Sequence, residues 1–288
     1  MTRRIALLCT LGLGLLSPGV RGVASAAQPV PQRVMSLNLC ADQLLLALLP
    51  PQRIASLTWL SASEGDPYWL PVVRQLPRNH GSAEEVLAAR PDLVIVGAYT
   101  TAAARQLLAR TATPVLVLQP AQDWQGIREV TRQVAAAVGA VPRGEQLLAE
   151  MEATLAQLAA TRPIDPLRVI GWSGGNDVPG RDTLFDAILT AAGAVNVGAA
   201  AAGRSDFDLE QLLLLRPQVL LRGAAYASTP SMRNEVAAHR VVRRLYAGAQ
   251  LTYPEAVYGC GVPRAAQLAA QLRQQLQSVR AAQQERAP

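Results

Sequence analysis

Ser173 is the residue whose surroundings most directly suggest catalysis. It lies in Gly171-Trp172-Ser173-Gly174-Gly175, a G-x-S-x-G pattern that follows an apolar run. In this pattern a serine on a sharp turn acts as a nucleophile when an acid and a histidine lie beside it. Asp206 or Asp208 can supply the acid, and His239 is the only histidine after Ser173. The residue types therefore permit ester hydrolysis.

The residues that follow Ser173 argue against this chemistry. A nucleophile turn leads straight into a helix, whereas Pro179 and Gly180 interrupt one here. His239 lies within a helical stretch, residues 235–246, rather than on a loop. The chain also lacks a Walker A loop and a G-x-G-x-x-G opening. We therefore predict that it is not an enzyme, and an α/β-hydrolase-like esterase that uses Ser173 is the alternative.

Residues 1–26 have the features of an export signal. Arg3 and Arg4 supply positive charge, residues 5–16 are apolar, and Ala24-Ser25-Ala26 provides small residues for cleavage. The apolar run is shorter than the roughly 20 residues that span a bilayer. We expect a cleaved signal peptide, a mature chain that starts at Ala27, and a periplasmic location.

The charge of the mature chain is mild. The whole sequence has 27 basic and 21 acidic residues, and residues 1–26 contain three of the arginines and no acid, so the balance falls to 24 − 21 = +3. No basic cluster with interleaved aromatic residues occurs, which excludes nucleic acid as an expected partner. We expect a soluble monomer with no resident cofactor or metal.

The rest of the sequence alternates apolar strands with helices, which predicts an α/β fold built from βαβ units. The predicted strands span residues 33–37, 53–58, 92–96, 114–118, 167–171, 218–222 and 250–254. A long helical region, residues 126–139 and 143–160, separates the first four strands from the last three.

A short stretch occurs twice, once in each half of the chain. Residues 84–97 and 210–223 both read as an acid, a helix, an Arg-Pro turn, an apolar strand and a glycine. Their prolines are separated by 217 − 91 = 126 positions, and the same offset pairs Glu84 with Glu210. A fixed offset near half the chain length predicts two similar lobes.

These features together resemble the periplasmic binding proteins for cobalamin, haem and ferric siderophores, the receptor components of ABC importers. The resemblance rests on the signal segment, the repeated stretch, the long middle helix, and residues 36–48 and 182–198. It implies two βαβ-type lobes joined by one long α-helix, with the ligand in a cleft between the lobes. The predicted boundaries are 27–141 for the N-terminal lobe, 142–162 for the connecting helix and 163–288 for the C-terminal lobe.

The resemblance also implies partners and a ligand. An iron chelate (ferric siderophore) or a corrinoid is expected, with haem as the alternative within the family. One exposed acid on each lobe is expected to dock onto arginines of the membrane permease, which works with an ATPase subunit. These acids correspond to Glu84 and Glu210. The simpler alternative is that both are solvated acids in the first turn of a helix.

The ligand site is expected where the parallel strands end, because ligands of open α/β sheets bind at the carboxyl ends of the strands. Loops at these ends contain seven of the 12 aromatic residues, whose flat faces suit a macrocycle or a bulky chelate. These are Trp59, Tyr68, Trp69, Tyr99, Trp172, Tyr226 and Tyr258. The alternative for each is a ring that caps the core at the base of a loop.

Two further polar positions lie on these loops or near them. Arg181 can pair with an anionic ligand group or with Asp182 or Asp177. His80 can ligate a metal centre axially or be polar surface.

Cys40 and Cys260 fall on predicted cleft loops of different lobes. They can be unrelated thiols, a disulfide between the lobes, or soft donors that face the ligand. A disulfide or inert thiols are favoured over metal ligation, and spacing alone does not decide between those two.

Overall fold

The apolar runs of the sequence form the strands of two separate parallel sheets. The structure is a computed structural model that describes residues 29–100, 106, 108, 110, 113–175, 178–201, 207–224 and 231–285. The predicted signal peptide lies outside the described residues.

Each lobe contains one of the sheets. The first consists of β1 (Val34–Ser36), β2 (Ile54–Thr58), β3 (Arg78–Asn79), β4 (Leu93–Gly97) and β5 (Val115–Leu118), in the order β3-β2-β1-β4-β5. The second consists of β6 (Arg168–Gly171), β7 (Val195–Asn196), β8 (Val219–Gly223) and β9 (Gln250–Tyr253), in the order β7-β6-β8-β9. All strand pairs are parallel. The continuous Val, Ile and Leu runs of β4 and β8 fit strands that are covered on both faces.

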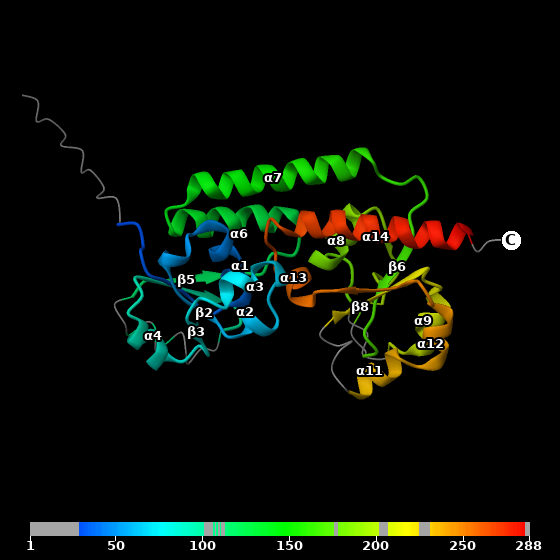
Figure 1. The fold of residues 1–288 in the computed structure, drawn as a ribbon, viewed down its shortest axis with the longest axis horizontal. Coiled ribbons are helices and arrows are strands. Elements are labelled where there is room, and N and C mark those ends of the chain that lie inside the picture. Colours follow the sequence, from blue (N-terminus) through cyan, green and yellow to red (C-terminus); the bar gives the residue numbers. More distant parts are fainter. Residues whose placement is uncertain are drawn as a thin grey trace, which may run out of the picture.

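Helices surround the sheets, and one long helix joins the lobes (Figure 1). The N-terminal lobe has α1 (Leu39–Leu48), η1 (Pro51–Arg53), α2 (Leu60–Ser63), η2 (Pro67–Trp69), α3 (Leu70–Val73), α4 (Ala83–Ala89) and α6 (Trp124–Ala137). The C-terminal lobe has α8 (Leu184–Ala191), α9 (Leu209–Leu215), α11 (Met232–Ala237), α12 (Arg240–Leu245), α13 (Glu255–Gly259) and α14 (Ala265–Glu285). The connector is α7 (Val141–Ala160), which runs along the top of Figure 1 above α6 and α14.

The structure differs from the predicted elements in two places. The edge strands β3 and β7 are only two residues long, too short to produce an apolar pattern. The helical stretch predicted over residues 235–246 is divided between α11 and α12, because the His239 side chain caps the start of α12. No helix in the described part of the chain has the length and apolar character needed to cross a membrane.

The repeated stretch has the same local structure in both lobes. Helix α4 ends at Arg90 and α9 ends at Arg216, both in the left-handed conformation, with φ of 44° and 45°. A proline follows each arginine and cannot continue the helix. An arginine at the first strand of each lobe then binds the free carbonyls of the helix end. Arg33 Nη2 donates to Ala89 O at 2.6 Å, and Arg168 Nη2 donates to Leu215 O at 2.6 Å.

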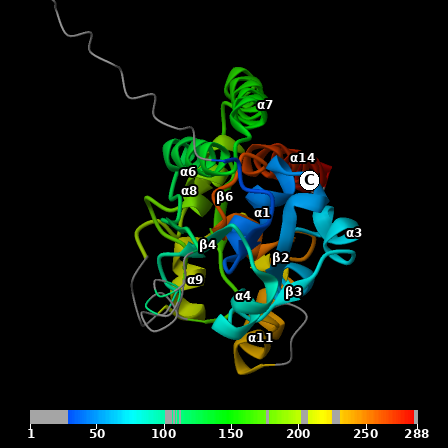
Figure 2. The same cartoon turned by 90° about the vertical axis from the view of Figure 1, so that its left-hand side faces the viewer.

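The two lobes exchange parts of their hydrophobic cores. Cys260 and Val262, which follow the last strand of the C-terminal lobe, pack in the core around α1 and β4. Ala121, from the N-terminal lobe, packs in the core around α8 and α14. Helix α14 also lies against the connector α7, as the end-on view in Figure 2 makes visible. The lobes are therefore joined by buried contacts as well as by the connecting helix.

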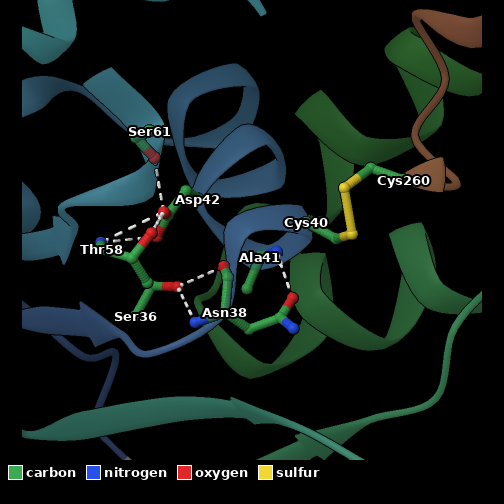
Figure 3. Close-up of a disulfide and its surroundings, with 8 residues drawn as sticks. All are labelled: Ser36, Asn38, Cys40, Ala41, Asp42, Thr58, Ser61 and Cys260. Atoms are coloured by element: carbon green, nitrogen blue, oxygen red, sulfur yellow. Dashed lines mark hydrogen bonds between the residues drawn. A yellow bond between two sulfur atoms is a disulfide. The ribbon is translucent and has the colours of Figure 1, made fainter. Parts of the chain in front are cut away.

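Asp42 anchors α1 to the neighbouring strand and turn. Its fully buried carboxylate accepts hydrogen bonds from Thr58 N at 3.1 Å, from Thr58 Oγ1 at 2.5 Å and from the hydroxyl of Ser61 (Figure 3). Burial raises the pKa of Asp42 from its ordinary value of 3.8 to about 6, although the hydrogen bonds oppose the shift. The folded protein therefore binds a proton at Asp42 more tightly than the unfolded chain does.

This shift predicts a pH-dependent stability that Asp42→Asn removes. The contribution from Asp42 is fully present below pH 3.8 and is lost as the pH rises through about 6, by up to roughly 3 kcal/mol. Denaturant unfolding at several pH values between about 4 and 6 measures it. The difference in unfolding free energy between wild type and variant should change across this window. A constant difference would show that Asp42 does not titrate there.

Candidate functional site

A pocket lies at the carboxyl ends of the N-terminal strands. It encloses about 250 Å³ and is lined from both lobes. Asn38 follows β1, Tyr99 follows β4, and Gln119 and Pro120 follow β5, while Gly259 and Gly261 come from the C-terminal lobe. The Tyr99 ring is 87% exposed, so its faces are open to a ligand.

A second pocket continues on the C-terminal side. It encloses about 220 Å³ and shares Gly259 with the first pocket. Its aromatic residues are Phe185, Tyr253 and Tyr258, with ring centroids 4.8 to 5.9 Å apart. Burial raises the pKa of Tyr258 far above its ordinary range, so its phenol stays neutral. The two adjoining pockets, which we call the interlobe cleft, are the candidate ligand site.

Two of these aromatic residues were missed from the sequence. Phe185 lies in the first turn of α8, and Tyr253 is the last residue of β9. The signal for Tyr253 was present, because it ends a strand whose carboxyl end was expected to face the ligand. Phe185 carried no comparable signal, since nothing in a helical sequence tells which residue turns toward a cleft.

A disulfide between Cys40 and Cys260 lies beside the interlobe cleft (Figure 3). Cys40 is in the first turn of α1 and Cys260 follows α13, and their Cα atoms are 4.9 Å apart across 220 positions of sequence. Of the three alternatives for these cysteines, the structure has the bond between the lobes. Sulfur atoms in a disulfide are not thiolate donors, so this arrangement does not supply soft metal ligands.

Tyr68 and Trp69 do not join the cleft pockets. They line a separate pocket of about 100 Å³ with residues of α7 and the start of α14. The Arg264 guanidinium lies 4.1 Å from the centre of the Tyr68 ring and is paired with buried Asp66. These residues connect the N-terminal lobe to the start of α14 and so form a second contact between the lobes.

Trp59 and His80 lie together near the ends of β2 and β3. Their rings stack with centroids 6.0 Å apart, and Trp59 is 45% exposed. His80 Nδ1 is 3.4 Å from Glu85, and the histidine side chain is 75% exposed. A neighbouring carboxylate fixes the orientation of many metal-binding histidines, so His80 has the chemistry of a ligand with its other nitrogen available.

Trp172 and Ser173 have structural surroundings. Trp172 is 2% exposed and packs edge-on against Phe207 in the core of the C-terminal lobe, the alternative considered for these rings. Ser173 Oγ accepts a hydrogen bond from Gly223 N at 3.0 Å, and no helix follows the serine directly. His239 caps α12 and Asp208 caps α9. Their side chains therefore serve helix ends rather than a catalytic triad with Ser173.

The remaining predicted residues are placed as follows. Arg181 is exposed and, within the described residues, forms no ion pair with Asp182. Tyr226, Asp177 and the other candidate acid for Ser173, Asp206, lie outside the described residues. Glu84 and Glu210 are exposed in the first turns of α4 and α9. Among the side chains that the structure describes, neither acid has a hydrogen-bond or ion-pair partner. No cluster of three metal-ligating side chains occurs in the same described ranges.

The paired glycines of the repeat permit close approach of polar side chains. A Cβ atom on Gly97 would lie 2.4 Å from the Asn38 amide, and one on Gly223 would lie 1.6 Å from the Glu255 carboxylate. The side-chain oxygen Oδ1 of Asn38 in turn accepts a hydrogen bond from Ala41 N and caps the start of α1. The repeated glycine therefore leaves room for a polar side chain at the mouth of each half of the cleft.

Comparison with known proteins agrees with this architecture. A sequence profile described as periplasmic binding protein matches residues 34–251. The periplasmic heme-binding protein RhuT from Roseiflexus sp. RS-1 is similar at 22% identity and a TM-score of 0.72, with 86% of this chain and 98% of that chain covered. The heme-binding protein HutB of Vibrio cholerae is similar at 22% identity and a TM-score of 0.69, covering 85% and 98%.

A vitamin B12 binding protein has the same fold. BtuF of Vibrio cholerae is 16% identical, with a TM-score of 0.63 and coverage of 87% of this chain and 98% of that one. No curated protein matches the sequence. The profile covers most of the chain, so the chain belongs to the periplasmic binding protein family. This is a family of two-lobed solute-binding proteins rather than enzymes, so the esterase alternative loses its support.

The exchanged core segments predict that Gly261→Ala is destabilising. The added Cβ would lie 2.2 Å from the Ala121 Cβ, where the segments cross. We expect a loss of about 1–3 kcal/mol, the usual cost of overpacking. Gly259→Ala is the matched control, because nothing lies within 4 Å of its added Cβ. Denaturant unfolding compares the two, and equal stabilities would mean that the crossing is loosely packed.

Proposed function

We propose that this chain is the solute-binding component of an ABC importer. It captures a metal chelate in the interlobe cleft and delivers it to the membrane permease, while ATP hydrolysis belongs to a separate subunit. The observation that carries the proposal is the pair of pockets that meet at Gly259, one from each lobe. The predicted signal peptide and the disulfide suit a periplasmic protein, since disulfides persist in oxidising compartments.

A chelate with flat or bulky apolar faces fits the chemistry of the cleft. The N-terminal side presents the exposed Tyr99 ring, and on the C-terminal side the pocket is lined by half-buried Tyr253 and by Tyr258, which is only 5% exposed. Aromatic faces of this kind contact a macrocycle with little loss of side-chain entropy. An iron chelate (ferric siderophore) or a corrinoid is therefore the proposed class of cargo.

Haem is an equal candidate within this class. RhuT and HutB, which share the fold, are both named as heme-binding proteins. At the strand ends of the N-terminal lobe, the Tyr99 phenol lines the cleft and is the candidate axial donor to haem iron, whereas the His80 imidazole stacks on Trp59 and lines neither cleft pocket. The Tyr99 phenol is thus a group that recognises the cargo metal itself, whereas a corrinoid needs only contacts to its ring.

Small lobe movement on binding follows from the contacts between the lobes. Besides α7, the lobes are joined by the disulfide, by the Asp66–Arg264 pair and by the exchanged core residues. Hinge closure by large rotation would break these contacts. Capture is therefore a modest shift between similar states rather than a wide opening and closing.

Titration of the purified chain with haemin, cyanocobalamin and a ferric siderophore tests this function. Tryptophan quenching reports binding, and Trp59 is its exposed indole. The Gly259→Leu side chain points into open space shared by both pockets, so we expect about ten- to hundredfold weaker binding of the active ligand. Thermal unfolding should be unchanged. Failure of all three ligands, or unaltered affinity in the variant, would contradict the proposed cleft.

Glu84 and Glu210 are the proposed permease contacts. Both are exposed and in equivalent positions, and neither carboxylate is neutralised by a partner in the described part of the chain. Complementary charge orients an encounter and speeds association more than it adds affinity.

Reversal of both charges, Glu84→Arg with Glu210→Arg, should abolish uptake of the chelate by cells or by reconstituted transporter. The affinity for the ligand should stay within about twofold, because neither acid lines either of the two cleft pockets. Uptake and titration are measured on the same preparation. Normal transport by the double variant would refute the docking role.

A further inference from the structure

The faces that carry Glu84 and Glu210 are alike beyond their acids. From Glu84 to Arg90 the side chains are exposed, half-buried, buried, exposed, exposed, half-buried and exposed, and residues 210–216 follow the same order. Each acid is followed three positions later by an exposed leucine. Leu87 is 59% exposed and Leu213 is 36% exposed. Residues three apart lie on one face of a helix, so acid and leucine form one surface.

Both surfaces are held rigidly. The single buried residue of each helix, Val86 or Leu212, faces the core, and the arginine clamps at Arg33 and Arg168 hold the helix ends. Each helix also begins with a side-chain cap, from Ser82 or Asp208. A preorganised surface of this kind loses little entropy when a partner binds.

The two helices that carry these surfaces lie on the side of the molecule opposite the connecting helix. In Figure 1, α4 lies at the lower left and α9 at the right, both below α7, and Figure 2 also places both in the half opposite α7. A single exposed leucine needs no explanation. Two leucines stand in the same register on different lobes, each beside an exposed acid that has no partner among the described side chains, and this arrangement matches one partner that contacts both lobes.

We propose that Leu87 and Leu213 are apolar anchors of the docking surface, and that the partner presents a basic group beside an apolar pocket at two places. This inference rests on the proposed function, because the partner is the importer's permease. Charge complementarity at the acids brings the partner into register, and burial of the leucines then slows dissociation. Leu214, 80% exposed where the N-terminal lobe has Ala88, makes the C-terminal surface the more apolar of the two.

The test separates the contribution of the acids from that of the leucines by their effects on the association and dissociation rates. The chain's own permease–ATPase complex is reconstituted in lipid nanodiscs and immobilised, and association and dissociation rates are measured at low and high salt. The leucine variant is Leu87→Gln with Leu213→Gln, which keeps helix propensity. The acid variant is Glu84→Gln with Glu210→Gln. Ile164→Gln is the control, because Ile164 is fully exposed but follows α7 rather than α4 or α9.

We expect the leucine variant to dissociate at least about tenfold faster than wild type, with the same association rate and salt dependence. The acid variant should associate more slowly and lose salt dependence. Ile164→Gln should match wild type, and all variants should bind the chelate normally. If the leucine variant dissociates from the transporter at the wild-type rate, the anchor role of the leucines is overturned and the proposed function is not affected. A wild-type chain that binds chelate but not the transporter overturns the docking partner as well, and one that binds neither overturns the proposed function.

Discussion

The exchange of core residues between the lobes is the constraint on which the rest of the structure depends. Val262 and Cys260 complete the core of the N-terminal lobe, and Ala121 completes that of the C-terminal lobe. The disulfide between Cys40 and Cys260 links the exchanged segment of the C-terminal lobe covalently to α1 of the N-terminal lobe. The exchanged segments also line the interlobe cleft, at Ala121 and Gly261. The distance between the Tyr99 side and the Tyr258 side of the cleft is therefore set by buried packing. The cleft is thus preorganised for a ligand of limited size.

The repeated unit explains how similar binding lobes arise from different sequences. In each lobe an arginine at the start of the first strand binds the carbonyl groups at the end of a short helix. A second arginine, whose backbone is in the left-handed conformation, and a proline follow that helix, and a glycine ends the next strand. One offset of 126 positions keeps the acid, the arginine and the glycine in register. The same unit serves both faces of the lobe, since its glycine lies at the cleft and its acid lies on the outer surface.

The fold was largely predictable from sequence, and the site was predictable only in part. Buried strands such as β4 and β8 are continuous apolar runs, so their positions followed from composition, whereas two-residue β3 and β7 have no pattern to detect. Aromatic loop residues were identified as a group, yet Tyr99 is open, Trp172 is in the core and Tyr68 faces α14. The direction of a ring depends on tertiary neighbours, which spacing along the chain does not contain.

The crossing also has a consequence for biogenesis. A chain is made from its N-terminus, so residues 29–137 leave the ribosome long before residues 260–262, which the first core requires. The N-terminal lobe must therefore remain incomplete, with an apolar gap beside α1, until synthesis is nearly finished. A chain truncated before Cys260 would keep this apolar gap and a reduced Cys40, because the disulfide partner is in the last segment to be made.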